Sequence, residues 1–157
     1  MKIKPRKQPD GEACGPTSIQ MAADSLGLPV SFKEIARISK YKKSGGMTNT
    51  GLVKTLEKLG FVAAEKIGAT WNDLASGSDK GVAIVSWMLK GYIGHFSVVD
   101  HVTKTHIFLA DPSEGKIIRM PKMVFMRLWF DYDDMWFPKK NTDIQLRWMV
   151  RVTKNEA

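Results

Sequence analysis

The spacing of apolar residues changes along this chain, from a helical period in the first half to a strand period in the second. After Gly15-Pro16, apolar residues recur at i, i+3, i+4 and i+7 from Ile19 to Leu26, the pattern of a helix with one buried face. Residues 146–152 alternate in the manner of a half-exposed strand. Helices first and strands later predict an α+β fold, with N-terminal helices packed on a C-terminal antiparallel β-sheet.

Start and stop signals place four helices in the first half. Pro16 suits the first turn of a helix that Gly27 ends. Residues 31–34 have the spacing of a capping box and predict that a second helix begins there. Further helices are expected over residues 50–59, which precede a glycine, and over residues 70–74, which begin with a capping threonine.

The second half contains strand signals. Residues 81–89 form a short apolar run bounded by glycines, which predicts a buried strand. Residues 95–102 and 106–110 are rich in β-forming side chains and predict a hairpin that turns at Thr103. A helix from Pro121 is expected to bury four side chains, Val124, Phe125, Leu128 and Trp129, and the aromatic segment 130–137 is expected to cap the core beside the sheet.

The length and composition predict one domain. The chain has 157 residues and a formal net charge of +8. A domain of that length buries about 70% of the surface that its unfolded chain exposes, and without a linker we expect residues 1–157 to form a single domain. No apolar run approaches the roughly 20 residues that cross a bilayer, and no apolar segment follows the charged N-terminus. We therefore expect a cytoplasmic protein without a transmembrane segment or signal peptide.

The basic charge does not by itself define a partner. Lysines and arginines are scattered along the chain and do not alternate with aromatic residues as they do in proteins that stack on nucleic acid bases. We interpret them as a solvated surface, and we expect no nucleic-acid partner.

Cys14 is the single cysteine, which excludes an internal disulfide and a cysteine-rich zinc site. It lies at the start of the first predicted helix, where unpaired N–H groups and the helix dipole lower the pKa of a thiol. A thiolate there could act as a nucleophile, whereas a lone cysteine is also commonly a small buried apolar residue. A base close to the thiol would favour the nucleophile over the buried apolar residue.

The predicted hairpin offers such a base. A turn centred on Thr103 places His95 opposite Asp111, with Cβ atoms about 5 Å apart. The carboxylate could then accept one imidazole N–H and leave the other ring nitrogen free as a base. The other histidines, His101 and His106, lie toward the far end of the same hairpin and are not expected to join this site.

Cysteine, histidine and aspartate in this order are an arrangement for acyl transfer, in which the thiolate attacks a carbonyl, the imidazole transfers protons and the carboxylate orients the imidazole. Such a reaction also needs a donor for the oxyanion. Gln8, six residues before Cys14, can supply a side-chain N–H if the intervening loop folds back.

These segments together resemble one family. The stretch Gln8-Pro-Asp-Gly-Glu-Ala-Cys14-Gly-Pro-Thr-Ser is similar to the glutamine-and-cysteine motif of the bacteriocin-processing peptidases, which belong to the papain-like cysteine peptidase superfamily. Gly94-His95-Phe-Ser-Val-Val is similar to the histidine strand of that family, and Ala110-Asp111-Pro112-Ser-Glu-Gly to its aspartate turn. Gly45-Gly46-Met-Thr-Asn-Thr-Gly51-Leu resembles the helix between these segments.

The resemblance implies a papain-like fold with Cys14 as nucleophile, His95 as general base, Asp111 as its orienting partner and Gln8 as oxyanion donor. Members of this family cleave leader peptides after Gly-Gly or Gly-Ala, often as one domain of an export ATPase. This sequence ends at Ala157 without a nucleotide-binding motif, so we expect a stand-alone peptidase acting on a peptide or protein, with export or virion machinery as a partner. Gly45-Gly46 is interpreted as a turn before a helix rather than as a site of self-cleavage.

Two alternatives use the same residues differently. An amidase, deamidase or transglutaminase-like acyltransferase would use the same thioester chemistry on another amide. A non-catalytic papain-like module would only bind a peptide or protein. Neither metal nor cofactor is expected, because no metal-ligand spacing or phosphate-binding glycine loop is present. Four residues just before the histidine are expected near the cleft: Trp87, Gly91, Tyr92 and Gly94.

Overall fold

Four helices precede the first strand. The computed structural model describes residues 2–75, 81–132 and 137–156. The helices are α1 (Cys14–Ser25), α2 (Phe32–Ser39), α3 (Tyr41–Ser44) and α4 (Asn49–Lys58). The Ser31 hydroxyl accepts the N–H of Glu34 at the start of α2, and the Thr48 hydroxyl accepts that of Gly51 at the start of α4. The sequence does not predict α3, because four residues are too few to show a helical period.

A six-stranded sheet follows, and each pair of neighbouring strands is antiparallel. The strand order is β1-β8-β2-β3-β4-β5. The bounds are β1 (Val62–Lys66), β2 (Val82–Leu89), β3 (Ile93–Val102), β4 (His106–Asp111), β5 (Lys116–Pro121) and β8 (Met149–Thr153). This arrangement confirms the predicted α+β fold. The sequence does not predict β1 and β5, because these edge strands bury few side chains and so show no apolar alternation.

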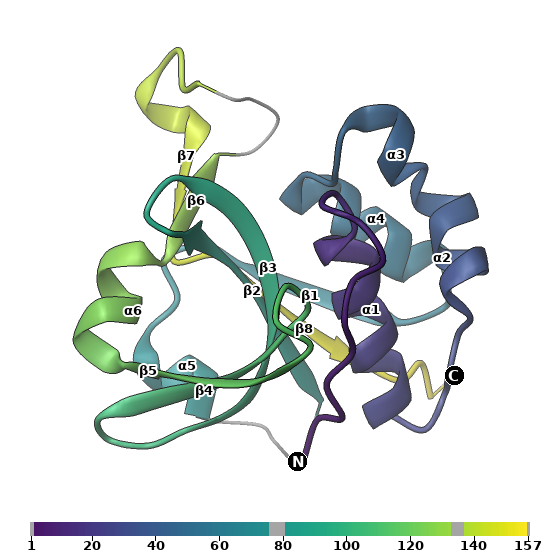
Figure 1. The fold of residues 1–157 in the computed structure, drawn as a ribbon, viewed down its shortest axis with the longest axis horizontal. Coiled ribbons are helices and arrows are strands. Elements are labelled where there is room, and N and C mark those ends of the chain that lie inside the picture. Colours follow the sequence, from purple (N-terminus) through teal and green to yellow (C-terminus); the bar gives the residue numbers. More distant parts are fainter. Residues whose placement is uncertain (1, 76–80, 133–136, 157) are drawn as a thin grey trace.

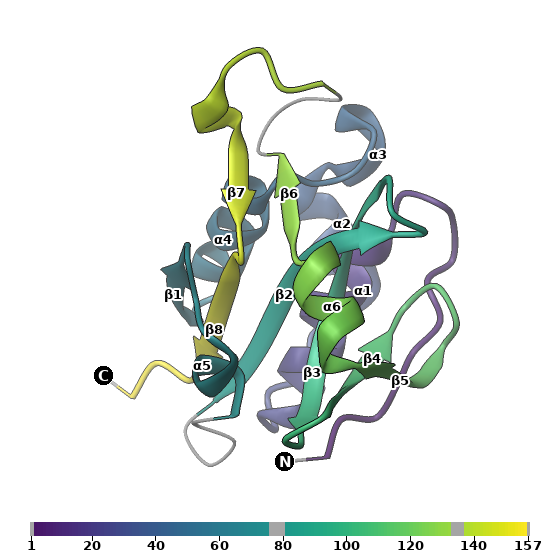
Figure 2. The same cartoon turned by 90° about the vertical axis from the view of Figure 1, so that its left-hand side faces the viewer.

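Helices cover both faces of this sheet (Figures 1 and 2). On one face, α1, α2 and α4 form what we call the first core, which includes Ile19, Leu52 and Leu56. On the other face, α5 (Trp71–Ala75) and α6 (Lys122–Leu128) form the second core, which includes Trp71, Phe125 and Trp129. Strand β2 contributes Ile84 to the first core and Val85 to the second. Burial on both faces explains why residues 81–89 form a continuous apolar run.

The β3–β4 hairpin has a different register from the one predicted. Val99 pairs with Leu109, but His101 pairs with Phe108, so Asp100 is an extra residue in β3. This β-bulge and a turn centred one to two residues beyond Thr103 shift the pairing. Continuing the register from Val98 and Ala110 places Ser97, and not His95, opposite Asp111. His95 remains on the same face of the sheet, two residues away and within diagonal reach.

Residues 146–152 do not form the single half-exposed strand that the sequence predicts. Leu146 belongs to β7 (Ile144–Leu146), which pairs with β6 (Phe130–Tyr132) in a separate two-stranded sheet, and its side chain is 48% exposed. The chain turns at Arg147, where φ is 52°, before it enters β8. Strand β8 lies inside the large sheet and buries Met149 as well as its alternate neighbours, so it is not half-exposed.

Two other predicted inward positions are exposed. Val124 lies on the outer side of α6, whereas Phe125 and Trp129 are buried as predicted. Phe137 is 78% exposed and does not cap the core. Trp136 of the same aromatic segment lies outside the described residues.

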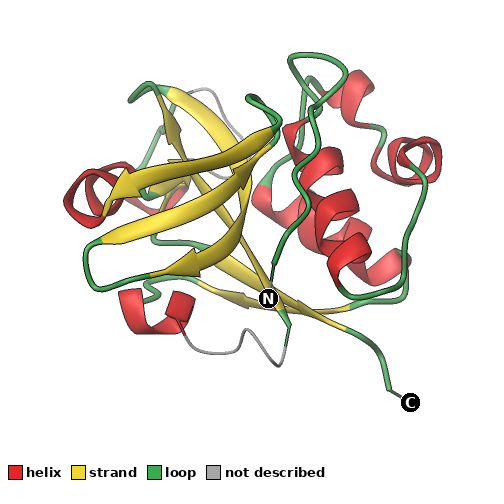
Figure 3. Ribbon diagram, turned by 60° about the horizontal axis from the view of Figure 1, so that its bottom comes forward, coloured by secondary structure: helices red, strands yellow, loops and turns green. Residues whose placement is uncertain are grey.

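The N-terminal segment runs between the helices and the sheet before it turns into α1 (Figure 3). The Ile3 N–H donates to the carboxylate of the bulged Asp100 at 2.7 Å, and the Arg6 guanidinium pairs with Asp24 of α1 at 2.7 Å. These contacts fix the path of the chain toward Gln8. Among the described residues, no helix has both the length and the hydropathy to span a membrane.

Candidate active site

Cys14 is the first residue of α1, as the sequence predicts, and its side chain is partly exposed. The first N–H groups of a helix have no acceptor within the helix, so they are available to bind a group near the start of α1. Gly15 lets the Met47 side chain pack closely against α1, since a Cβ built at Gly15 would lie 2.7 Å from Sδ of Met47. The start of α1 therefore presents the sulfur at the surface, beside unpaired backbone donors.

His95 lies on β3 with its ring almost fully buried. Its Nε2 is 2.5 Å from Oδ1 of Asp111, and the Trp87 ring packs against it edge to face at 5.6 Å between centroids. Cys14 is close enough to the imidazole to raise its pKa. Because Nε2 is engaged by the carboxylate, Nδ1 is the ring nitrogen left for the thiol. The structure thus brings Cys14, His95 and Asp111 together in the predicted order.

The charged form of His95 is favoured in this setting. Burial of the ring lowers the pKa of His95, but the hydrogen bond to Asp111 and the interaction with Cys14 outweigh it and raise the pKa to about 9. An imidazolium is therefore stable at neutral pH beside Cys14.

Asp111 is fully buried and accepts hydrogen bonds on both oxygens. Oδ1 accepts from Ser97 at 3.1 Å in addition to His95, and Oδ2 accepts the N–H of Glu114 at 3.1 Å. Burial raises the pKa of Asp111, but His95 and these donors lower it below its usual value. Ser97 is a member of this site that the sequence does not reveal, because a serine in a strand has no distinctive spacing.

Gln8 lies next to the aspartate turn. Its backbone N–H donates to the carbonyl of Pro112 at 2.8 Å, and its side-chain Nε2 donates to the carbonyl of Asp10 at 2.7 Å. An amide nitrogen has two hydrogens, so one remains for a second acceptor. Oε1 of Gln8 is buried and has no hydrogen-bond partner among the described residues. The loop between Gln8 and Cys14 folds back, as the sequence predicts.

The loop from Gln8 to Cys14 is attached to α3. The Tyr41 hydroxyl donates to Oδ2 of Asp10 at 2.7 Å, and the tyrosine side chain is buried. Oδ1 of Asp10 accepts the N–H of Glu12 at 2.9 Å. Tyr41 and Asp10 are further members of the site that sequence reasoning missed, since a tyrosine more than 30 residues away gives no local signal.

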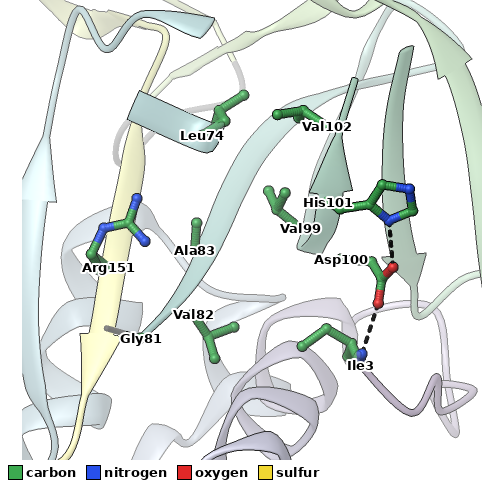
Figure 4. Close-up of a pocket in the computed structure, with 10 residues that line it drawn as sticks. All are labelled: Ile3, Leu74, Gly81, Val82, Ala83, Val99, Asp100, His101, Val102 and Arg151. Atoms are coloured by element: carbon green, nitrogen blue, oxygen red, sulfur yellow. Dashed lines mark hydrogen bonds and ion pairs between the residues drawn. The ribbon is translucent and has the colours of Figure 1, made fainter. Parts of the chain in front are cut away.

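Other chemically active side chains lie elsewhere. His101 is exposed, stacks on Phe108 and pairs with Asp100, and His106 bonds Thr105. A pocket of about 240 Å³ is lined by Arg151, Asp100, His101 and apolar neighbours, and includes none of the predicted site residues (Figure 4). No cluster of His, Cys, Asp or Glu in the described ranges could hold a metal ion.

The residues predicted near the cleft divide into two groups. Trp87 is buried against the His95 ring, and Gly94 leaves room for the Asp131 carboxylate, 2.9 Å from where a Cβ would lie. Tyr92, in contrast, is 75% exposed in the turn between β2 and β3 that also contains Gly91. Trp87 and Gly94 therefore help to shape the surroundings of His95.

The fold and this site define a papain-like cysteine peptidase. The model of the Peptidase C39 family matches residues 2–140, and the chain belongs to that family. A curated relative from Lactococcus lactis subsp. lactis, the lactococcin-G-processing and transport ATP-binding protein LagD, is 31% identical over 113 residues. That match covers 70% of this chain and 15% of LagD.

Solved structures show the same fold. The peptidase domain of Streptococcus ComA, a bifunctional ABC transporter of a quorum-sensing pathway, matches with a TM-score of 0.73 at 23% identity, covering 98% of this chain and 99% of that domain. A double glycine motif protease from an AMS/PCAT transporter, solved with its leader peptide, matches with a TM-score of 0.72 at 16% identity over 98% and 93% of the two chains. A C39-like peptidase from Bacillus anthracis matches with a TM-score of 0.69 at 14% identity over 99% and 100%.

Proposed function

We propose that this protein hydrolyses a peptide bond through a covalent intermediate on Cys14. The observation that carries the proposal is that His95, paired with the buried carboxylate of Asp111, also interacts with Cys14 at the start of α1. Cys14 is the nucleophile, His95 the general acid and base, Asp111 the residue that orients the imidazole, and Gln8 an oxyanion donor.

The reaction begins from a thiolate and an imidazolium. The sulfur attacks the carbonyl carbon, and the oxyanion that forms is bound by Nε2 of Gln8 and the backbone N–H of Cys14. The imidazolium gives its proton to the leaving amine as the C–N bond breaks, which leaves a thioester on Cys14. A water then loses a proton to His95 and attacks the thioester, and the C–S bond breaks, which releases the acid product and regenerates the Cys14 thiolate beside the imidazolium.

The substrate that we propose is a leader peptide that ends in a double glycine. Family membership supports this class, as do the similarity to a double glycine motif protease solved in complex with the leader peptide and the similarity to the lactococcin-G-processing protein. We further propose that the 157-residue chain cleaves by itself, with an export system as the partner that receives the product.

Mass spectrometry of a synthetic leader–core peptide tests this function. We expect two fragments whose masses add up to the substrate plus one water, with the break after the double glycine, and no fragments with Cys14→Ala. A substrate with an intact backbone but a changed side-chain amide would instead identify a deamidase or acyltransferase. Unchanged peptide that binds wild type and Cys14→Ala equally would identify a binding module.

A further inference from the structure

A chain of hydrogen bonds reaches the catalytic carboxylate from the second core. The Trp87 Nε1–H donates to Oγ of Ser97 at 3.0 Å, and Oγ of Ser97 lies 3.1 Å from Oδ1 of Asp111. Ser97 is fully buried and Trp87 nearly so. Two residues that do not touch the thiol are thus linked to the group that holds His95.

The direction of this chain is fixed by chemistry. An indole N–H can only donate, so Trp87 occupies a lone pair of the Ser97 hydroxyl. An ionised carboxylate can only accept, so the single hydroxyl hydrogen of Ser97 points to Asp111. The order from Trp87 to Ser97 to Asp111 is therefore the one arrangement that satisfies all three groups.

The bulge in β3 makes this contact. Asp100, the extra residue, shifts the register by one position, so that Ser97 rather than Val98 faces Asp111. Trp87 pairs directly with His95 on the neighbouring strand, and its indole extends to Ser97 on the same face. Oδ1 of Asp111 then receives Ser97 and His95 together, while Oδ2 receives the N–H of Glu114. These three donors fix the rotation of the carboxylate.

We propose that Ser97, oriented by Trp87, is a positioning residue that holds the Asp111 carboxylate in the plane in which it binds His95. This proposal rests on the proposed function, because the imidazole matters only if it serves Cys14. Ser97 acts through Asp111 and is not expected to contact substrate.

A matched pair of variants isolates the hydroxyl. Ser97→Thr keeps it, whereas Ser97→Val has nearly the same shape without it. We expect Ser97→Thr to react like wild type, and Ser97→Val to lose about tenfold in kcat, with KM unchanged, because it lacks one hydrogen bond to a charged group. The alkylation of Cys14 by iodoacetamide at pH 6.5, which needs no substrate, should slow to a similar extent.

A second change separates catalysis from folding. Ser97→Val also leaves the buried Trp87 N–H without its acceptor, and we expect the Tm to fall by about 5 °C. In a Trp87→Phe background that N–H is absent, so there Ser97→Val should lower the Tm less than it does in wild type but should still lower kcat about tenfold. If Ser97→Val left kcat unchanged in that background, the positioning role would be overturned, since the loss in wild type would then be structural.

His95→Ala distinguishes a failure of the Ser97 role from a failure of the proposed function. If it alkylates much more slowly than wild type while Ser97→Val matches Ser97→Thr, only the role of Ser97 is overturned. If His95→Ala alkylates as fast as wild type, the imidazole does not activate the thiol, and the proposed function fails together with the proposal built on it.

Discussion

The charge on His95 decides the pH range in which the site can work. Its pKa of about 9 in the folded protein compares with 6.5 for the free side chain. Because the folded value is the higher one, the charged ring contributes to the stability of the fold. That contribution is fully present below about pH 6.5 and is lost as the pH rises through about 9.

Asp111→Asn should therefore lower the upper pH limit of activity. The variant removes the carboxylate that stabilises the imidazolium, so we expect the alkaline limb of kcat/KM, near pH 9 in wild type, to move toward 6.5. Steady-state rates from pH 5 to about 10 check this. The same alkaline midpoint in both proteins would show that Asp111 does not support the charge on His95.

Gln8 should stabilise the oxyanion of the intermediate without changing the reactivity of the thiolate. Gln8→Ala removes one donor to the tetrahedral intermediate, and we expect kcat to fall by about 10²- to 10³-fold. Alkylation of Cys14 by iodoacetamide forms no oxyanion, so its rate should stay within about twofold of wild type. Lys4→Ala, an exposed change in the same segment, is the control for both measurements. An equal loss in both reactions would mean that Gln8 supports the thiol instead.

At the scale of elements, helix α3 holds the loop that contains Gln8. The contact is the hydrogen bond from Tyr41 to Asp10, whose backbone carbonyl accepts the Gln8 amide. Burial, followed by the Asp10 carboxylate, raises the pKa of Tyr41 to about 12, so the phenol keeps its donor throughout the neutral range.

Tyr41→Phe should loosen this loop while it leaves the ring in place. We expect kcat to fall several-fold and the Tm to fall by a few degrees, because Asp10 loses its buried donor. Lys42→Ala is the matched control: the ammonium lies 3.9 Å from the same carboxylate but is exposed, so its loss should change little. Equal effects of the two variants would show that general charge near Asp10, rather than the tyrosine hydrogen bond, holds the loop.

The elements also show where sequence reasoning stops. Helices with an apolar face and a cap are evident from the residues, as at Ser31 and Thr70. The edge strands β1 and β5 are not, because a strand without a buried face has no pattern. The bulged Asp100 accepts the N–H of Ile3, nearly a hundred residues away, and no local rule predicts that contact.

The candidate site follows the same division. Cys14 could be placed from its position before a helix, and His95 and Asp111 could be paired even with the wrong register, because an error of two residues keeps both side chains on one face. Ser97, Tyr41 and Asp10 could not be found, since their roles depend on partners brought close only by the complete fold.

Across the molecule as a whole, the proposed triad joins two layers. Cys14 belongs to the helices beside the first core, whereas His95 and Asp111 belong to strands of the sheet. Trp87, which contacts His95, is part of the second core. The site therefore requires both cores to be intact. Because β2 contributes side chains to both, we expect the two cores to unfold together.

This coupling predicts that the protein unfolds in one step and loses activity in that same step. In urea, far-UV circular dichroism, tryptophan fluorescence and peptidase activity should share one midpoint, because neither core can open without exposing β2. Leu52→Ala in the first core and Phe125→Ala in the second should each lower the free energy of unfolding by about 2–5 kcal/mol and move all three midpoints together. Met123→Ala, on the exposed side of α6, should move none. If Leu52→Ala abolished activity at a urea concentration where the fluorescence of the second core was still native, the helical layer would unfold separately, and the site would depend on an interface between two units rather than on one cooperative fold.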